Sequence, residues 1–218
     1  MLTFTEENYI KELYHITDRG HDQVTTNGIA SALSTSPAAA SAMLKRLTGK
    51  GLVNHLKYKG AVLSEEGKEV ALEIIRKHRL WETFLVNKLN FCWDEVHEVA
   101  EQLEHIHSPL LIERLDAFLE YPKFDPHGDP IPDKNGKFDT VKLQPLSETA
   151  LNLEQKLVTV KTDNNDVLRF LDKIALYPGA TIKVVDKNDF DKSIEVYINN
   201  STMVFISDQI AQNLLVGD

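Results

Sequence analysis

Histidine and glutamate residues recur at helical spacing between Ile75 and Ser108, and this pattern restricts how the segment can fold. His78 and Glu82 are one helical turn apart. A second group follows at His97, Glu101, Glu104 and His105. On a helix of about 3.6 residues per turn this second group shares one face. Imidazole nitrogens and carboxylate oxygens bind borderline and hard divalent metals, so two such helices can converge on one or two ions. The alternative is a pair of solvated amphipathic helices.

Length and composition indicate an intracellular protein of one to three small domains. The 218 residues include 42% hydrophobic residues, enough for packed cores. The single cysteine, Cys92, can form neither an internal disulfide nor a thiolate zinc cluster, and we expect it to be a buried apolar group. The first residues do not form a signal peptide, and no apolar run reaches the roughly 20 residues of a membrane span. We therefore expect a cytoplasmic protein that has no membrane partner.

The distribution of charge points to DNA although the net charge is −9. No aspartate or glutamate occurs from Gln23 to Ser64. The basic residues of this stretch are Lys45, Arg46, Lys50, Lys57 and Lys59. A basic, acid-free segment inside an acidic chain is typical of a module that contacts DNA.

The same stretch has the pattern of a winged helix-turn-helix. A short helix over Thr26–Leu33, a turn at Ser34–Pro37 and a second helix to about Thr48 give the motif. Ser36 can cap the second helix, and Pro37 fits its first turn. Two strands over Leu52–Leu63 then form the wing, with lysines near its tip.

The second helix of the motif begins with unusually small side chains, which would let it sit deep in a major groove. The alternative is a small-residue helix packed tightly on a neighbour. Lysines of the wing would contact phosphates. The predicted DNA contacts are Thr26, Ser36, Pro37, Ala38, Ala39, Ser41, Lys45, Lys57 and Lys59.

The remaining elements are further helices and then strands. We predict helices from Thr5, as N-cap, to about Gly20, from Ser64 to about Lys88, over Asp94–His105, and from Ser108-Pro109 onward. Their apolar residues exceed what one small helical layer can bury, which favours a homodimer. These residues are Leu80, Trp81, Phe84, Leu85, Leu110, Leu111, Leu115 and Phe118. Residues 121–151 are rich in Pro, Asp and Gly. After Asn152 the alternating runs KLVTVK, ATIKVVDK, SIEVYINN and STMVFIS predict four strands, with one helix at Asp166–Ile174.

The expected fold is mainly α with a small β domain. It comprises a winged helix-turn-helix DNA-binding domain at 1–64 and a helical metal-binding and dimerisation domain at 65–120. A linker at 121–151 precedes a small all-β or barrel-like domain at 152–218.

The chain resembles the diphtheria-toxin-repressor family of metal-dependent transcriptional repressors over its whole length. The resemblance rests on TEENYIKELYHI, the helix-turn-helix, KYKGAVLSEEG, RKHRLWE, VHEVAEQLEHIHS and the PHGDPIP segment. It implies that the C-terminal domain is an SH3-like β-barrel. It also implies a homodimer that divalent metal orders, so that the dimer binds double-stranded operator DNA and represses metal-uptake genes.

The resemblance also implies which residues bind metal. Glu101, Glu104 and His105 match the inner regulatory ligands, and the N-terminal ligand falls at Asn8. His78, Glu82 and His97 match a second site. A further site in some relatives corresponds to Asp125, where they place cysteine, to His127, and to an acidic residue at Asp163 or Asp166. Manganese-type relatives place a glutamate where this chain has Lys11, and an ammonium group cannot be a ligand.

The donor types favour Mn²⁺ or Fe²⁺, and Zn²⁺ could bind in vitro. Glu101 favours manganese over iron as the effector, because iron-type relatives carry a sulfur ligand at this position. Two other functions stay open: a metal-dependent hydrolase, and a metal-independent winged-helix regulator whose His/Glu face is only a soluble dimer surface. A separate alternative is that Asp125 and His127 are solvated turn residues. Against the hydrolase, no nucleophile or phosphate-binding loop stands out, so we expect neither an enzyme nor a small-molecule substrate.

Overall fold

The computed structural model describes residues 2–17, 19–56, 60–92, 95–139, 142–162 and 164–217. The chain divides into two compact units, each formed from separate stretches of sequence. Unit 1 comprises Met1–His78, Glu101–Ile112 and Pro132–Phe138, and unit 2 comprises Arg79–Ala100, Glu113–Ile131 and Asp139–Asp218.

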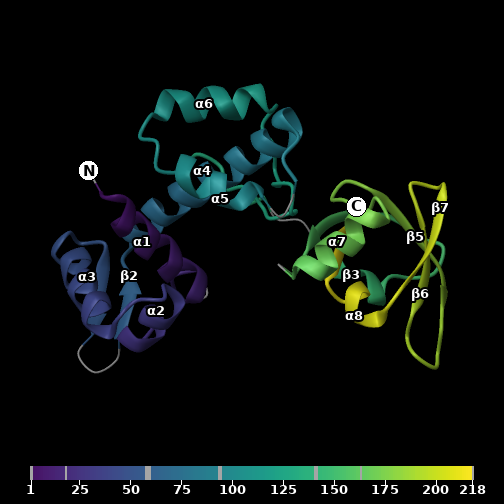
Figure 1. Cartoon of the computed structure of the whole chain (residues 1–218), viewed down its shortest axis with the longest axis horizontal. Coiled ribbons are helices and arrows are strands. Elements are labelled where there is room, and N and C mark those ends of the chain that lie inside the picture. The colour runs from purple at the N-terminus through teal and green to yellow at the C-terminus, as the bar shows by residue number, and fades with distance from the viewer. Residues whose placement is uncertain are drawn as a thin grey trace. The chain divides into compact units, whose positions relative to one another are not determined.

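The N-terminal part of unit 1 is the winged helix-turn-helix that the sequence predicts. Helices α1 (Phe4–Ile16), α2 (Thr26–Ala32) and α3 (Pro37–Gly49) lie beside the hairpin of β1 (Val53–Leu56) and β2 (Gly60–Leu63) (Figure 1). The strands pair antiparallel, Val53 opposite Leu63, and the Val24 backbone adds two hydrogen bonds of 2.9 Å to Ala61. The expected wing lysines, Lys57 and Lys59, lie outside the described residues.

Capping side chains set where these helices begin. The N-cap of α1 is Thr3 and not Thr5, because Thr3 and Glu6 form a reciprocal capping box two residues earlier. The Ser36 hydroxyl accepts from the Ala39 N–H at 3.2 Å, and Pro37 occupies the first turn of α3. Helix α1 ends at Ile16, before the expected Gly20.

The core of the DNA-binding part is apolar and continuous. Side chains of α1, α2, α3 and both wing strands meet in it, with Ile10, Leu13, Ile29, Leu44 and Leu47 almost fully buried. Burying a large aliphatic side chain contributes about 1.5–3 kcal/mol, so this cluster holds α1 against the helix-turn-helix.

Three further helices follow. Helix α4 (Glu65–Leu89) is capped by Ser64, whose hydroxyl accepts from the Gly67 N–H at 2.9 Å. Helix α5 (Val96–Leu103) ends sooner than predicted, so Glu104 and His105 lie in the turn after it and not on its regular face. Helix α6 (Pro109–Phe118) starts at a proline, which follows Ser108 as expected.

The expected dimer-forming residues differ in burial. Leu80, Trp81, Leu85 and Leu115 are buried within the chain, whereas Leu110, Leu111 and Phe118 of α6 remain exposed. Phe84 is half-buried. Cys92 is exposed, so the expectation of a buried cysteine is wrong. Among the described residues, none of the helices combines the length and apolar character that crossing a membrane requires.

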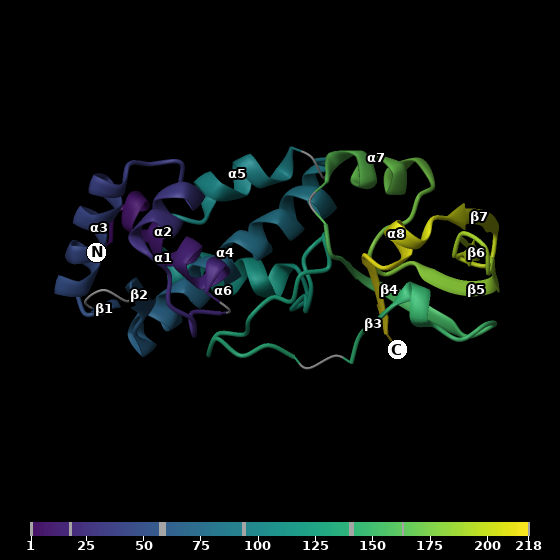
Figure 2. The same cartoon turned by 90° about the horizontal axis from the view of Figure 1, so that it is seen from below.

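The C-terminal part of unit 2 is a six-stranded antiparallel sheet of order β3-β8-β4-β5-β6-β7. Its strands are β3 (Gln144–Pro145), β4 (Glu154–Val160), β5 (Thr181–Lys187), β6 (Ile194–Ile198), β7 (Thr202–Ile206) and β8 (Leu214–Gly217). The short helix η1 (Leu146–Glu148) follows β3, and α7 (Asn165–Lys173) and α8 (Asp208–Ala211) lie beside the sheet (Figure 2). Strand β3 falls within the stretch expected to be a linker.

Candidate metal centre and nucleic-acid interface

Helix α3 presents its small side chains away from the core. Ala40, Leu44 and Leu47 are buried at spacings of four and three residues, so the other faces of the helix are free of the core. The exposed positions are Ser36, Pro37, Ala38, Ala39, Ser41 and Lys45, while Thr26 at the start of α2 is half-buried. The alternative that these small residues pack tightly on a neighbouring element of the chain is therefore not supported, because they are exposed.

Glu6 of α1 anchors the end of α3. One of its carboxylate oxygens lies 2.8 Å from Nε of Arg46 and 2.7 Å from Nζ of Lys50, and the side chain is fully buried. Burial raises the pKa of Glu6, but Lys50, the Thr3 N–H and Arg46 outweigh it and lower the pKa to about 2. The first turn of α1 is thus fixed to α3 by charge.

Five predicted ligands lie in unit 1, and we name them the inner donor set: Asn8, His78, Glu101, Glu104 and His105. The resemblance assigned His78 to the second site with Glu82 and His97, whereas the structure places it against Glu104. Glu104 is at its centre and is fully buried. Its Oε2 lies 2.6 Å from Nδ1 of His78, and its Oε1 lies 3.9 Å from Nε2 of His105. Burial raises the pKa of Glu104, but the His78 hydrogen bond and the Lys11 ammonium lower it below its ordinary value.

Glu7 orients the His105 ring. Oε2 of Glu7 is 2.6 Å from Nδ1 of His105, and Phe4 stacks on the same ring with centroids 4.5 Å apart. When Nδ1–H donates to a carboxylate, the lone pair of Nε2 is left to bind a metal. Nε2 of His105 is the nitrogen on the Glu104 side, so this arrangement suits a metal ligand.

Asn8, the fifth member of the inner donor set, has an oxygen that is unpaired within the described part of the chain. Oδ1 of Asn8 is buried and has no hydrogen-bond partner among the described residues. A buried amide oxygen without a donor is costly, and a cation would satisfy it. Asn8 lies one turn before Lys11 on α1, whose ammonium contacts Glu101 and Glu104. The inner donor set therefore fits a divalent ion by its donor chemistry and by this orphaned atom.

Four predicted ligands lie in unit 2, and we name them the outer donor set: Glu82, His97, Asp125 and His127. The buried Oε1 of Glu82 lies 3.4 Å from Nδ1 of His97 and 3.8 Å from Nε2 of His127. A buried carboxylate between two imidazoles is a donor arrangement suited to Mn²⁺, Fe²⁺ or Zn²⁺.

Asp125 is a buried residue that shapes its own turn and not a solvated one. Its Oδ1 accepts the N–H groups of His127 and Asp129, both at 2.9 Å, and Arg79 lies 3.6 Å from its other oxygen. Burial and the neighbouring Asp129 and Glu82 carboxylates raise the pKa of Asp125 well above its ordinary value. Asp125 and Glu82 are both buried, and a cation would relieve the repulsion between these two carboxylates.

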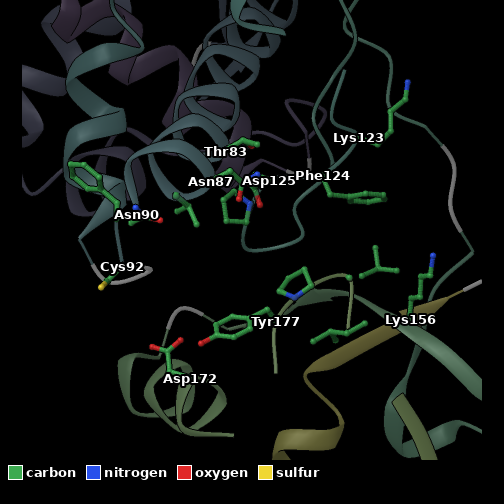
Figure 3. A pocket seen from close by; sticks show the side chains of 17 residues that line it. Thr83, Asn87, Asn90, Cys92, Lys123, Phe124, Asp125, Lys156, Asp172 and Tyr177 are labelled. Atoms are coloured by element: carbon green, nitrogen blue, oxygen red, sulfur yellow. The ribbon is translucent and has the colours of Figure 1, made fainter. Parts of the chain in front are cut away.

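Asp125 also lines a cavity of about 850 Å³ in unit 2. Figure 3 shows Thr83 and Asn87 of α4 on the side opposite Tyr177 and Asp172, with Lys123 and Lys156 along a third side. No other member of the outer donor set is among the lining residues, so the cavity is adjacent to the set and does not contain it.

The resemblance gave two positions for a further acidic ligand, Asp163 and Asp166. Asp163 lies outside the described residues, and Asp166 is exposed in the first turn of α7. The sequence did not predict that Glu7 holds the His105 ring, nor that Lys11 contacts both Glu101 and Glu104. The only signal for Glu7 was its place one position before Asn8.

Three family patterns match consecutive parts of the chain. Residues 1–61 match "Iron dependent repressor, N-terminal DNA binding domain" and residues 64–133 match "Iron dependent repressor, metal binding and dimerisation domain". Residues 144–217 match the FeoA domain. The C-terminal sheet is accordingly the SH3-like β domain that the resemblance implied.

Solved structures and curated relatives agree with these family matches. A manganese-dependent transcriptional repressor in complex with manganese is 32% identical with a TM-score of 0.78, covering 97% of this chain and 98% of that one. ScaR with bound Cd²⁺ is 34% identical with a TM-score of 0.68, covering 98% and 99%. The iron-dependent repressor IdeR of Mycobacterium tuberculosis (strain ATCC 25618 / H37Rv) is 33% identical over 131 residues, 60% of this chain and 56% of IdeR. The chain thus spans just over half the length of that curated relative. These proteins are repressors and not enzymes, and the chain belongs to the diphtheria-toxin-repressor family of metal-dependent transcriptional repressors.

Proposed function

We propose that this protein is a metal-activated repressor in which the inner and outer donor sets bind divalent ions and thereby favour operator binding. Mn²⁺ or Fe²⁺ is the proposed effector, since all donors are nitrogen or oxygen. The genes it would control are those for uptake of the same metal. The proposal rests most of all on α1, which joins the inner donor set to the recognition helix.

Neighbouring residues of α1 make the two connections. Glu6 pairs with Arg46 and Lys50 at the end of α3, and Glu7 holds His105 of the inner donor set. Asn8 and Lys11 extend the second connection along the same helix. Ligands drawn from α1, α4 and the turn after α5 favour a single placement of α1 when an ion binds. Because Glu6 is paired with Arg46 and Lys50 of α3, that placement is passed to the DNA-binding surface.

A homodimer would bring two copies of α3 to one palindromic operator. The exposed Leu110, Leu111 and Phe118 of α6 lie in the part that matches the dimerisation domain, and we assign them to the dimer contact. Phe118 also packs on Phe84, with ring centroids 6.2 Å apart, so the apolar surface continues onto α4.

The test is fluorescence anisotropy on DNA from upstream of the protein's own gene, with chelator and then with Mn²⁺, anaerobic Fe²⁺ or Zn²⁺. Binding should appear only with metal, and the ranking gives the effector. Glu104→Gln and His105→Ala should abolish the metal response, whereas Glu69→Gln and His15→Ala, both exposed and outside the donor sets, should keep it. Equal binding with and without metal would contradict the proposal.

Separate variants address the outer donor set. Glu82→Gln removes the carboxylate that His97 and His127 share and should lower the number of ions bound per chain. Equilibrium dialysis with Mn²⁺ measures that number. An unchanged ion count in Glu82→Gln would show that the outer donor set is not a metal site.

A further inference from the structure

Lys11 already places a positive charge inside the inner donor set. Its ammonium lies 2.7 Å from Oε1 and 2.9 Å from Oε2 of Glu104, and it also contacts Oε1 of Glu101. The lysine side chain is only 11% exposed, and that of Glu104 is not exposed at all. This lysine is therefore a buried charge on a helix whose neighbouring positions carry Glu7 and Asn8.

The contacts of Lys11 satisfy its charge. An ammonium has three N–H donors, and a buried one is tolerated only when opposite charge and hydrogen bonds compensate its lost hydration. Lys11 has three carboxylate oxygens from two residues around it. Those oxygens belong to the glutamates that would share a divalent ion, so the ammonium and the ion need the same ligand atoms.

We propose that Lys11 is a built-in competitor for the metal: its ammonium neutralises Glu101 and Glu104 in the metal-free protein, and a divalent ion binds them only by displacing it. The inference rests on the proposed function in taking the inner donor set as a metal site. Lys11 is not a ligand in this scheme, and it sets the metal concentration at which the inner donor set fills.

Displacing the Lys11 ammonium costs free energy, and this cost is subtracted from the free energy of metal binding. The ion gains contacts with Glu101, Glu104 and His105, but the ammonium loses charge-assisted hydrogen bonds, which are among the stronger ones. The inner donor set should therefore bind metal more weakly than the same residues would without the lysine. The benefit is a metal-free state in which the fully buried Glu104 is never left without a positive neighbour.

The experiment compares Lys11→Met with wild type by equilibrium dialysis and calorimetry with Mn²⁺. Lys11→Met should bind Mn²⁺ at least about tenfold more tightly at the inner donor set, the factor that loss of one charged hydrogen bond corresponds to. With chelator, the same variant should melt at a lower temperature than wild type, since Glu104 has then lost its cation. Lys11→Arg keeps the charge and should restore the wild-type metal affinity.

Lys68→Met is the matched control. Lys68 is 15% exposed and pairs at 2.8 Å with Glu65, whose side chain is 84% exposed, so the substitution removes a lysine–glutamate pair at the surface, outside both donor sets. It should leave Mn²⁺ affinity unchanged. A structural role for Lys11 alone would lower the melting temperature without tightening metal binding, so affinity equal to that of Lys68→Met overturns the inference.

A second measurement uses the wild-type protein and applies if Lys11→Met does not fold. Acylation of lysines by an N-hydroxysuccinimide ester, read by mass spectrometry, should modify Lys11 faster with Mn²⁺ than with chelator. Lys68 serves as the internal reference. An unchanged rate at Lys11 in protein that has bound Mn²⁺ overturns displacement.

The results also separate this inference from the proposed function. Metal-dependent DNA binding in wild type with no gain of affinity in Lys11→Met removes the competitor role and keeps the repressor. A gain of Mn²⁺ affinity in Lys11→Met, while wild-type DNA binding ignores metal, supports the competitor role and contradicts the proposed function.

Discussion

Glu7 and His105 lie 98 positions apart in the chain, yet Oε2 of Glu7 is 2.6 Å from Nδ1 of His105. The carboxylate fixes the tautomer of an imidazole whose other nitrogen belongs to the inner donor set. Glu7→Gln should therefore weaken Mn²⁺ binding about 10–100-fold, the usual effect of losing such an outer partner. Calorimetry measures the loss, and Glu12→Gln on the same helix is the control. A variant that binds Mn²⁺ like the control would show that Glu7 does not support the ligand.

Glu6 makes stability depend on acid pH. Its pKa falls to about 2 in the folded protein, from an ordinary value of 4.5. A depressed carboxylate pKa contributes stability that is present above the ordinary value and is lost as pH falls toward the folded value. Glu6→Gln should therefore be destabilised relative to wild type at pH 6, and the difference should shrink toward pH 3. Urea unfolding at both pH values measures this, and a difference independent of pH would contradict it.

Lys45 offers a test of the DNA-binding surface that does not depend on the operator sequence. It is exposed on α3, the helix assigned to the major groove. Lys45→Ala should weaken binding to all DNA sequences and reduce the slope of log affinity against log salt by about 0.9, the value for one phosphate contact. Lys192→Ala, in an exposed loop of the β domain, should leave the slope unchanged. An unchanged slope in Lys45→Ala would remove Lys45 from the interface.

Gly128 allows the backbone after His127 to approach β4 closely. A Cβ there would lie 1.9 Å from the Val158 carbonyl oxygen, and φ is +84°. Gly179 also has a positive φ, +92°, but a Cβ there would meet nothing within 4 Å. Gly179→Ala should cost about 1–2 kcal/mol for its backbone alone, and Gly128→Ala clearly more. Thermal unfolding compares them, and equal costs would show that the close approach does not matter.

Local patterns predicted most of the elements. The apolar spacing of α3, its Ser36 cap and its proline were enough to locate the recognition helix, and alternation located β4 to β7. Boundaries failed where two caps compete, as at Thr3 and Thr5, and where α5 stops before Glu104. Strands β3 and β8 were not predicted. They pair with each other although about 70 positions separate them, and a strand as short as Gln144–Pro145 has no alternating pattern that would indicate this pairing.

The donor residues were visible in the sequence, but their partners were not. Helical spacing placed His78 and Glu82 one turn apart on α4, as found. Spacing could not show that the Lys11 ammonium contacts Glu101 and Glu104. The two glutamates are 90 or more positions away in the chain, so the contact exists only once α1 has packed beside them. Asp125 was read as a ligand or a solvated turn residue, whereas its hydrogen bonds to two N–H groups emerge only with the folded turn.

The discontinuous make-up of unit 1 has a consequence for synthesis of the protein. Glu7 and Lys11 meet His105 and Glu104 only when residues of the turn after α5 are available. During translation α1 leaves the ribosome long before these partners, so Lys11 and Glu7 are without their contacts to Glu104 and His105 until the turn after α5 has been made. The DNA-binding domain, with the apolar face of α1, can form its core early, but Glu7 and Lys11 on α1 meet their partners late. A nascent chain stopped before Glu101 should therefore have a folded helix-turn-helix whose first helix is insensitive to metal.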